Sequence, residues 1–333
     1  MGVTASVGII ANPASGRDIR RLVAGASVFG NADKAAMVFR LLAGLRAAGV
    51  ERALMMPAGD GLSRTLRRQL SGRAASALPA LVELDMPLTS TAADTTHAVQ
   101  RMCDEGVAAI VVLGGDGTHR VVAKACGDVP ICALSTGTNN VFPEMRETTV
   151  AGIATGLVAT GRAGPGALRR EAALVVERRG AAPDLALVDV AVTRERFVGA
   201  RALWRHEALC ELFVTFADPA AVGLSSVAGM LAPGGRGLHV RLAADPADAE
   251  VVVDVALAPG LVTPVAVAAF ETLEPGVEVA LAANGASLAL DGEREIERHG
   301  DDGATVRLAD GPLRIDVDAV MREHATSVQP AAS

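Results

Sequence analysis

The sequence predicts two domains: a parallel α/β sheet, followed by an all-β domain. In residues 1–161, short apolar runs alternate with stretches of helical spacing, which is typical of a doubly wound parallel sheet. In residues 166–312, runs of strand length are separated by turn residues, which favours a sandwich-like pair of sheets. The chain has 333 residues and is 50% hydrophobic, enough for two hydrophobic cores.

The first domain should alternate strands with helices. Val107–Leu113 is a continuous apolar run, as expected for a strand buried on both faces. Ala35–Ala48 has apolar residues at helical spacing and Gly49 as a stop signal. The expected strands are Val7–Ala11, Arg52–Met56, Leu81–Leu84, Val107–Leu113 and Pro130–Leu134. The expected helices are Ala35–Ala48, Asp94–Glu105 and Thr118–Cys126.

The second domain should begin after the hinge-like stretch Gly161–Gly166, which is rich in glycine and contains a proline. The C-terminal segment 313–333, with a helix over Val317–His324, could return to the first domain. The expected strands are Ala172–Arg178, Leu185–Val192, Leu209–Phe216, Leu238–Leu242, Val251–Leu257, Val277–Ala282, Ser287–Leu290 and Thr305–Leu308.

Composition excludes several classes of protein. A net charge of −7 argues against non-specific binding to nucleic acid or to an anionic membrane, because both need a basic footprint. The four cysteines show no Cys-x-x-Cys spacing, so we interpret them as reduced thiols of a cytoplasmic protein without structural zinc. The N-terminus has no signal-peptide pattern, and stable membrane association is not expected.

The loop Gly114-Gly115-Asp116-Gly117-Thr118 is the strongest functional feature. It follows a buried strand and precedes a helix, and ligands of open α/β sheets bind at the carboxyl ends of the strands. Glycines let the backbone approach a phosphate, and the helix N-terminus adds positive potential. Asp116 could accept a proton from an attacking hydroxyl or help to hold Mg²⁺. The spacing matches neither a P-loop nor a dinucleotide fingerprint.

Four motifs occur in the order known from one superfamily. The Gly114–Thr118 loop resembles the signature shared by NAD kinases, diacylglycerol kinases and sphingosine kinases. Asn12–Gly16 and Ser135–Phe142 are similar to two further loops of the lipid kinases, and Asp291–Glu293 is similar to the Asp-Gly-Glu turn of their β domain. Over nearly the whole first domain, the chain looks most like the acetoin-catabolism protein X (AcoX) branch of this ATP-NAD kinase superfamily.

The resemblance implies a Rossmann-like N-terminal domain and a C-terminal β-sandwich domain, with the active site in the cleft between them. It implies ATP and Mg²⁺ as cofactors, NAD(H) as one candidate substrate, and a homo-oligomer, since NAD kinases commonly assemble. Asp116 would be the catalytic base or the Mg²⁺ ligand. The implied nucleotide- and phosphate-binding residues are Asn12, Pro13, Ser15, Gly16, Gly114, Gly115, Gly117, Thr118, Thr136, Gly137 and Thr138. The candidate substrate-binding residues are Asn139, Asn140, Ser225, Ser226 and Glu293.

The acceptor half of the site departs from the family pattern. Arg120 and Val121 stand where the lipid kinases usually carry Asn-Glu, and Val141 stands where they carry Asp. Ser225 and Ser226 could contact a substrate phosphate or simply cap the following helix. We interpret Lys124 as a solvated side chain and His119 as an ordinary surface or hydrogen-bonded histidine.

Three functions fit these observations. The first is a kinase that transfers a phosphoryl group from ATP to a hydroxyl of a small soluble acceptor, with NAD(H) or a metabolite linked to acetoin breakdown as candidates. The second is a diacylglycerol-type lipid kinase, favoured by the Asn12–Gly16 loop. The third is a nucleotide- or dinucleotide-binding regulator without catalysis, favoured by the changed acceptor motifs.

Overall fold

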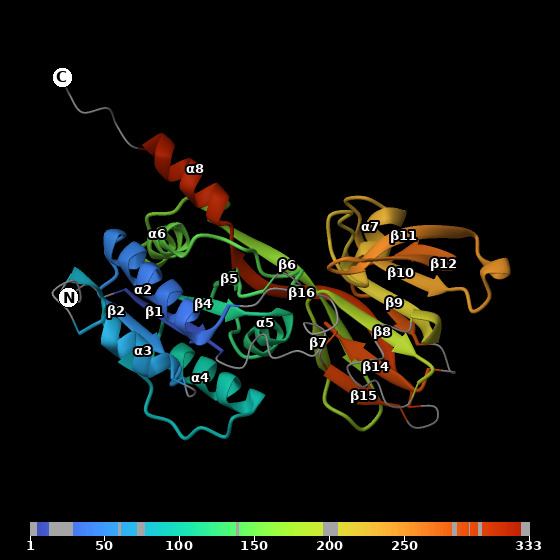
Figure 1. The fold of residues 1–333 in the computed structure, drawn as a ribbon, viewed down its shortest axis with the longest axis horizontal. Helices are drawn as coiled ribbons and strands as arrows, with labels where there is room; N and C mark the ends of the chain where they lie inside the picture. Colours follow the sequence, from blue (N-terminus) through green and yellow to red (C-terminus); the bar gives the residue numbers. More distant parts are fainter. Residues whose placement is uncertain are drawn as a thin grey trace.

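The computed structural model describes residues 5–12, 29–58, 61–71, 77–137, 140–195, 206–281, 285–292, 294–298 and 302–327. The chain forms an α/β lobe and a β lobe that lie side by side (Figure 1). No described helix is long and apolar enough to cross a membrane. The predicted fold class, a parallel α/β half followed by a β half, is confirmed.

The α/β lobe is built on a parallel sheet with the strand order β3-β2-β1-β4-β5. Its strands are β1 (Ser6–Ala11), β2 (Arg52–Met55), β3 (Ala80–Glu83), β4 (Ala109–Gly114) and β5 (Ile131–Ser135). The order reverses between β1 and β4, so the loops after these two strands lie at the switch point where α/β sheets bind ligands.

Helices cover both faces of this sheet. The lobe's helices are α2 (Asn31–Ala47), α3 (Leu62–Gln69), α4 (Ala92–Asp104), α5 (Asp116–Ala123) and α6 (Thr148–Ala159). Residues of α2, α3 and α6 share one hydrophobic core, and residues of α4 and α5 share the other. On β1, Val7 and Ile9 face the first core while Ile10 faces the second, as the alternation of a strand requires.

The sequence analysis did not predict α3 or α6. In α3, only Leu62 and Leu66 carry the apolar face, which is too short a pattern to recognise. Helix α6 is rich in glycine and β-branched residues, which favour other conformations. It is stabilised by close packing on α2, where Gly44 of α2 and Gly152 of α6 bring the two backbones together.

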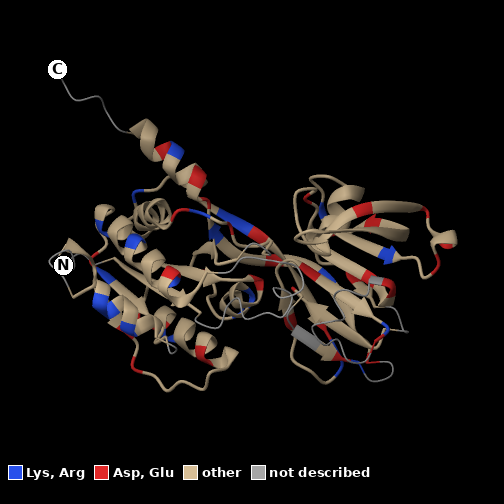
Figure 2. Ribbon diagram, in the orientation of Figure 1, with Lys and Arg blue, Asp and Glu red and all other residues tan. Residues whose placement is uncertain are grey.

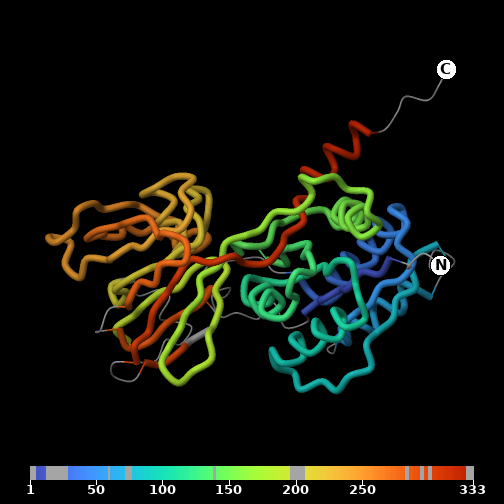
Figure 3. The backbone as a smooth tube through the Cα atoms, turned by 180° about the vertical axis from the view of Figure 1, so that it is seen from behind, coloured from blue at the N-terminus to red at the C-terminus, as the bar shows by residue number. Residues whose placement is uncertain are grey.

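Two long strands connect the lobes. The parallel sheet continues past β5 into β16 (Thr305–Ile315), then into β6 (Leu168–Glu177) and β7 (Asp184–Ala186). Strand β16 pairs with β5 in parallel at Arg314 and with β6 in antiparallel register along most of its length. Seen from either side, β6 and β16 run from one lobe into the other (Figures 1 and 3). The expected strand Thr305–Leu308 is therefore longer, and it belongs to the sheet of the α/β lobe.

The second sheet is antiparallel and has the strand order β11-β12-β10-β9-β8-β14-β15. One face packs against β6 and β16, through residues such as Phe213 and Leu308, and the other face packs against α7 (Ser225–Leu231). The strands of this sheet are β8 (Asp189–Thr193), β9 (Leu209–Phe216), β10 (Arg236–Leu242), β11 (Val251–Ala258), β12 (Leu261–Thr272), β14 (Ser287–Leu290) and β15 (Arg294–Glu297). The short strand β13 (Glu278–Ala280) pairs with β16 of the first sheet instead.

Three features of the β lobe differ from the sequence prediction, one of them the unpredicted strand β15. The expected strand Leu185–Val192 is divided into β7 and β8, because the chain turns at Leu187 and Val188 and passes from one sheet to the other. Strand β12 was not predicted, since Pro264 interrupts its apolar pattern. The last helix, α8 (Val317–Ser327), packs on α6 and contributes Val317 and Val320 to the core of the α/β lobe.

We expect Gly152→Ala to lower the stability of the protein. A Cβ at Gly152 would lie 2.4 Å from the backbone oxygen of Leu41, and backbone cannot move aside as a side chain can. The expected cost is about 2 kcal/mol, measured as a lower urea midpoint. Gly166→Ala is the matched control, because a Cβ there meets no atom within 4 Å. Equal midpoints for the two variants would contradict the close approach of α2 and α6.

Candidate functional site

The loops that follow β1, β4 and β5 are joined by backbone hydrogen bonds at the switch point. The amide of Asn12 donates to the carbonyl oxygen of Leu113 at 3.3 Å, and the amide of Thr136 donates to that of Gly114 at 3.3 Å. The amide of Phe29 donates in turn to the carbonyl oxygen of Thr136 at 3.2 Å. Three predicted site residues, Asn12, Gly114 and Thr136, are thus brought together from distant parts of the sequence.

Side chains reinforce this junction. Asn12 Nδ2 donates to Thr118 Oγ1 at 3.0 Å, and the buried Lys34 donates from Nζ to the carbonyl oxygen of Asn12 at 2.9 Å. Gly114 is needed for this packing, because a Cβ there would lie 2.6 Å from the Cβ of Thr118. The predicted Asn12–Thr118 neighbourhood is therefore a close contact, and Lys34 is a cation of this site that the sequence analysis did not assign.

Asp116 occupies the first position of α5 and is only 7% exposed. Its carboxylate accepts hydrogen bonds from two backbone amides of the loop after β5. Oδ1 accepts from Phe142 at 2.8 Å and from Val141 at 3.1 Å, and Oδ2 accepts from Val141 at 3.1 Å. Gly115 precedes α5 as its N-cap residue, and Gly117 lies in its first turn. The candidate catalytic carboxylate is thus held in a defined orientation by another loop of the site.

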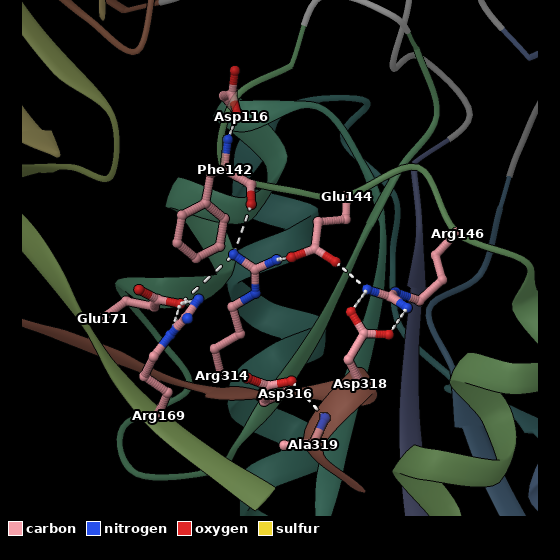
Figure 4. A network of polar contacts seen from close by, with 10 residues as sticks. All are labelled: Asp116, Phe142, Glu144, Arg146, Arg169, Glu171, Arg314, Asp316, Asp318 and Ala319. Carbon is pink, nitrogen blue, oxygen red and sulfur yellow. Dashed lines mark hydrogen bonds and ion pairs between the residues drawn. The ribbon is translucent and has the colours of Figure 1, made fainter. Parts of the chain in front are cut away.

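A polar network extends from Asp116 to the C-terminal helix (Figure 4). Phe142 donates its amide to Asp116, and its carbonyl oxygen accepts from Arg314 Nη1 at 3.1 Å. The Arg314 guanidinium lies 5.4 Å from the centroid of the Phe142 ring and pairs with Glu144. Glu144 also pairs with Arg146 at 2.6 Å, and Arg146 pairs with Asp318 of α8 at 2.6 Å.

The sequence analysis did not identify Arg314 as a site residue. No motif surrounds it, and it lies 198 positions beyond Asp116. Only the insertion of β16 beside β5 brings it under the Phe142 ring. Arg314 therefore acts on Asp116 indirectly. It bonds the carbonyl oxygen of Phe142, and the loop that contains Phe142 holds the Asp116 carboxylate.

The turn after Ser135 is closed by its own side chains. Ser135 Oγ donates to the carbonyl oxygen of Gly137 at 2.6 Å, and Asn140 Nδ2 donates to Ser135 Oγ at 2.7 Å. Asn140 thus stabilises this turn, and its predicted role toward substrate stays a prediction. The predicted site residues Pro13, Ser15, Gly16, Thr138, Asn139 and Glu293 lie outside the described residues.

Asp291 is the acid that begins the Asp-Gly-Glu turn. It adopts a left-handed conformation with φ of 51°, and its Oδ1 accepts from the amides of Leu187 and Val188 at 2.9 and 2.8 Å. Arg120 of α5 lies beside it, with Nε 3.7 Å from Oδ2. Burial raises the pKa of Asp291 to about 6, although the amides and Arg120 oppose this shift. Arg120, one of the residues that differ from the family pattern, therefore forms an ion pair between the lobes.

Ser225 and Ser226 lie in α7, which packs against β9 and β11 in the β lobe. The interpretation of these serines as helix caps is wrong, because Leu224 is the N-cap residue and makes no side-chain cap hydrogen bond. Ser226 Oγ donates to the carbonyl oxygen of Gly223 at 2.6 Å. Among the described residues, neither serine is hydrogen-bonded to the Asp116 loop, and Ser225 Oγ is buried without a hydrogen-bond partner. Their predicted role toward substrate stays a prediction.

Two neighbours of the loop agree with the sequence interpretation, because Lys124 is exposed and His119 is hydrogen-bonded. Lys124 is 42% exposed and also pairs with Asp184 of β7 at 2.8 Å, so it links the two lobes. His119 is completely buried, with Nδ1 2.8 Å from the carbonyl oxygen of Gly115. Burial lowers the pKa of His119 to about 4, so its ring is neutral near pH 7.

A cavity of about 360 Å³ adjoins the strand-end loops. It contacts the site through Ser135 and lies beside the start of α2, where Asp33 and Met37 contribute to its wall. Phe29, whose amide is bonded to Thr136, lines it as well. A cavity of this volume is at the lower end of the range that holds small ligands.

Comparisons with known proteins cover both lobes. Residues 7–163 match the ATP-NAD kinase N-terminal domain, and residues 172–311 match the acetoin catabolism protein X C-terminal domain. Acetoin catabolism protein X from Cupriavidus necator is 51% identical over 328 residues, which cover 95% of this chain and 91% of that protein.

Solved structures with a detectable likeness include two putative diacylglycerol kinases from Bacillus anthracis str. Sterne. One is 13% identical, with a TM-score of 0.48 over 94% of this chain and 97% of that chain. The other is 12% identical, with a TM-score of 0.42 over 94% of this chain and 98% of that chain.

We expect Asp291→Asn to change how stability depends on pH. The folded-state pKa of about 6 lies above the ordinary value of 3.8 for an aspartate side chain, so protonation of Asp291 stabilises the fold. This stabilisation is complete below about pH 4 and is lost as the pH rises through 6, by on the order of 3 kcal/mol in total. Urea unfolding of both proteins between pH 4 and 7 measures it: the stability of the variant relative to wild type should rise across this range. A difference that does not vary with pH would contradict the raised pKa.

Proposed function

The chain belongs to the acetoin catabolism protein X family, and we propose that it is an enzyme that transfers a phosphoryl group from ATP to a hydroxyl of a small soluble acceptor. The N-terminal match to ATP-NAD kinases supports the general class of reaction. The acceptor candidates are NAD(H) and small hydroxylated metabolites such as acetoin, the second because of the name of the relative.

The observation that carries this proposal is the placement of Asp116. It stands at the first turn of a helix that follows the central strand β4, next to the strand-order reversal of a parallel sheet. Two amides from the β5 loop orient its carboxylate. A carboxylate in this position can accept the proton of an attacking hydroxyl in the same geometry in every catalytic cycle.

The residues around Asp116 suit the phosphates of a nucleotide. The first N–H groups of α5 have no acceptor within the helix, and the helix dipole favours negative charge there. Gly115 lets a phosphate approach the backbone, because it carries no side chain, whereas the space beside Gly114 is taken by Thr118. Lys34 adds a buried positive charge next to Asn12.

Mg²⁺ would accompany the nucleotide. No group of three His, Cys, Asp or Glu side chains that could hold a metal occurs among the described residues. Mg²⁺ commonly binds through one or two carboxylates together with substrate phosphates, so the single carboxylate of Asp116 fits an ion of this kind. When bound, Mg²⁺ supplies positive charge to the phosphate oxygens.

The proposed step requires little covalent chemistry from the protein. The hydroxyl oxygen of the acceptor attacks the γ-phosphorus of ATP, the bond from that phosphorus to the bridging oxygen breaks, and ADP leaves. The hydroxyl proton passes to the carboxylate of Asp116. Arg314, through Phe142, keeps that carboxylate in place during the transfer.

A second candidate function is nucleotide binding without catalysis. It is favoured by the hydrogen bonds of Asp116, because both carboxylate oxygens already accept backbone amides. A protein of this kind would bind ATP or NAD(H) with the same loops and show no turnover.

We expect Asp116→Asn to reduce ADP release by roughly 100-fold or more, because the amide cannot accept the hydroxyl proton. The assay measures ADP release from Mg²⁺-ATP with NAD, NADH, acetoin and diacylglycerol micelles as separate acceptors. Asp104→Asn, which changes an exposed acid at the end of α4, should leave the rate unchanged.

The outcomes separate the candidate functions. ADP release that depends on one soluble acceptor and is lost in Asp116→Asn would support the proposal and identify the acceptor class. Activity that requires the micelle would favour lipid phosphorylation instead. ATP binding without ADP release for any acceptor would favour the binding protein, and full activity of Asp116→Asn would contradict the role of Asp116.

A further inference from the structure

A second, larger cavity lies where the two lobes meet. Its volume is about 500 Å³, and it is lined by residues of the β5 loop, of β6 and β16, and of the β lobe. No residue of the Gly114–Thr118 loop lines it. The cavity is therefore separate from the proposed phosphate site, although Val141 and Phe142 belong to its wall.

The wall of this cavity is more positive than the rest of the molecule. Four arginines and three carboxylates line it, which gives a formal charge of 4 − 3 = +1, whereas the whole chain carries −7. Figure 2 shows the charges of β6 in this region, with Lys and Arg in blue followed by Asp and Glu in red. The lining arginines are Arg169, Arg170, Arg236 and Arg314, and the carboxylates are Glu144, Glu171 and Asp218.

Three of these arginines are already paired. Arg169 bonds Glu171 at 2.7 Å, and Arg170 bonds Asp128 at 2.8 Å. Arg314 pairs with Glu144 and lies 3.6 Å from Glu171. These ion pairs hold the three arginine side chains on the side of the cavity that β6 and β16 form.

Arg236 differs from the other three. It begins β10 on the β-lobe side of the cavity and is exposed. Its backbone pairs with Phe216 of β9, but its guanidinium makes no hydrogen bond and no ion pair within 4 Å to any described residue, although Asp218 also lines the cavity. An unpaired guanidinium can bind a planar carboxylate or a phosphate through two parallel hydrogen bonds.

Apolar groups form the remaining wall. Phe142 and Phe216 both line the cavity, Phe142 from the β5 loop and Phe216 from β9, and Phe142 is only 3% exposed. Polar and charged residues outnumber the apolar ones in the wall, so the cavity suits a polar ligand with a small apolar part, and its volume lies in the range of roughly 300–1,000 Å³ typical of small-molecule sites. The other apolar lining residues are Val141, Ala172 and Leu187.

We propose that this cavity binds a small organic anion, with its carboxylate or phosphate group on Arg236 and its apolar body against Phe216. The ligand would touch Val141 and Phe142, whose amides hold Asp116. Its binding would thus stabilise the junction of the lobes beside the proposed catalytic residue. The site stands on its own contacts and does not require the kinase activity proposed above.

The test measures binding directly, by isothermal titration of the full chain. Benzoate and phenyl phosphate are the anionic probes, and benzamide is the uncharged match for benzoate. We expect one anion to bind about tenfold more tightly than benzamide, because only an anion gains the charge-assisted bonds of Arg236. Arg236→Gln should remove this preference, while Arg241→Gln, an exposed arginine on the same strand outside the cavity, should retain it.

Each outcome decides the proposal. Preference for benzoate or for phenyl phosphate identifies the head group that the site takes. Equal affinity for anions and benzamide, no binding of any probe, or an unchanged preference in Arg236→Gln would overturn the proposal. A preference that Arg241→Gln loses as well would mean general surface attraction and would also overturn it. An unchanged thermal midpoint of Arg236→Gln shows that the variant is folded.

Discussion

Strand β16 lies between β5 and β6 and pairs with both, and this pairing holds the two lobes together. It joins a strand near the end of the chain to the parallel sheet of the first lobe, and through β6 it makes one sheet span both lobes. Because sheet hydrogen bonds are directional and repeat along the strand, this pairing leaves the lobes little freedom where the strands cross. It also brings Arg314 to the loop that holds Asp116, and it carries α8 back onto α6.

Two buried carboxylates show how the chain accommodates charge at the lobe junction. Asp116 and Asp291 each accept backbone amides from another segment: Asp116 from the β5 loop, and Asp291 from the turn between β7 and β8. A carboxylate that is removed from water needs such donors, because its desolvation is otherwise uncompensated. For Asp291, burial still outweighs the amides and Arg120, and its pKa is raised to about 6. Both acids therefore connect elements that are distant in sequence.

The departures from the superfamily pattern acquire a physical meaning in this setting. Arg120 pairs with Asp291 across the junction, and Lys124, one helical turn later, pairs with Asp184 of β7. Helix α5 thus presents two cations to the β lobe, while its first turn carries the candidate catalytic acid. Val141, in the place of an aspartate, contributes its amide to Asp116 and its apolar side chain to the cavity between the lobes. If the protein is the kinase proposed above, Arg120 and Val141 would belong to the acceptor side of its site.

Local patterns of apolar and turn residues were enough to predict the alternation of strands and helices, the glycine loop after β4 and Asp116 as the candidate acid. They also indicated the second set of strands, but they could not reveal that one of the two sheets continues from the first lobe. The contact of Asn12 with Thr118, the support of Phe142 by Arg314 and the charged cavity at the junction became known from the folded structure alone. Each of these joins residues more than 100 positions apart or depends on strand pairing across lobes, and no local pattern encodes such contacts. No local sequence pattern indicated that β16 pairs with β5 and β6 either. The order of strands in a sheet depends on which neighbouring strand buries the most surface and supplies hydrogen-bond partners for the edge strand.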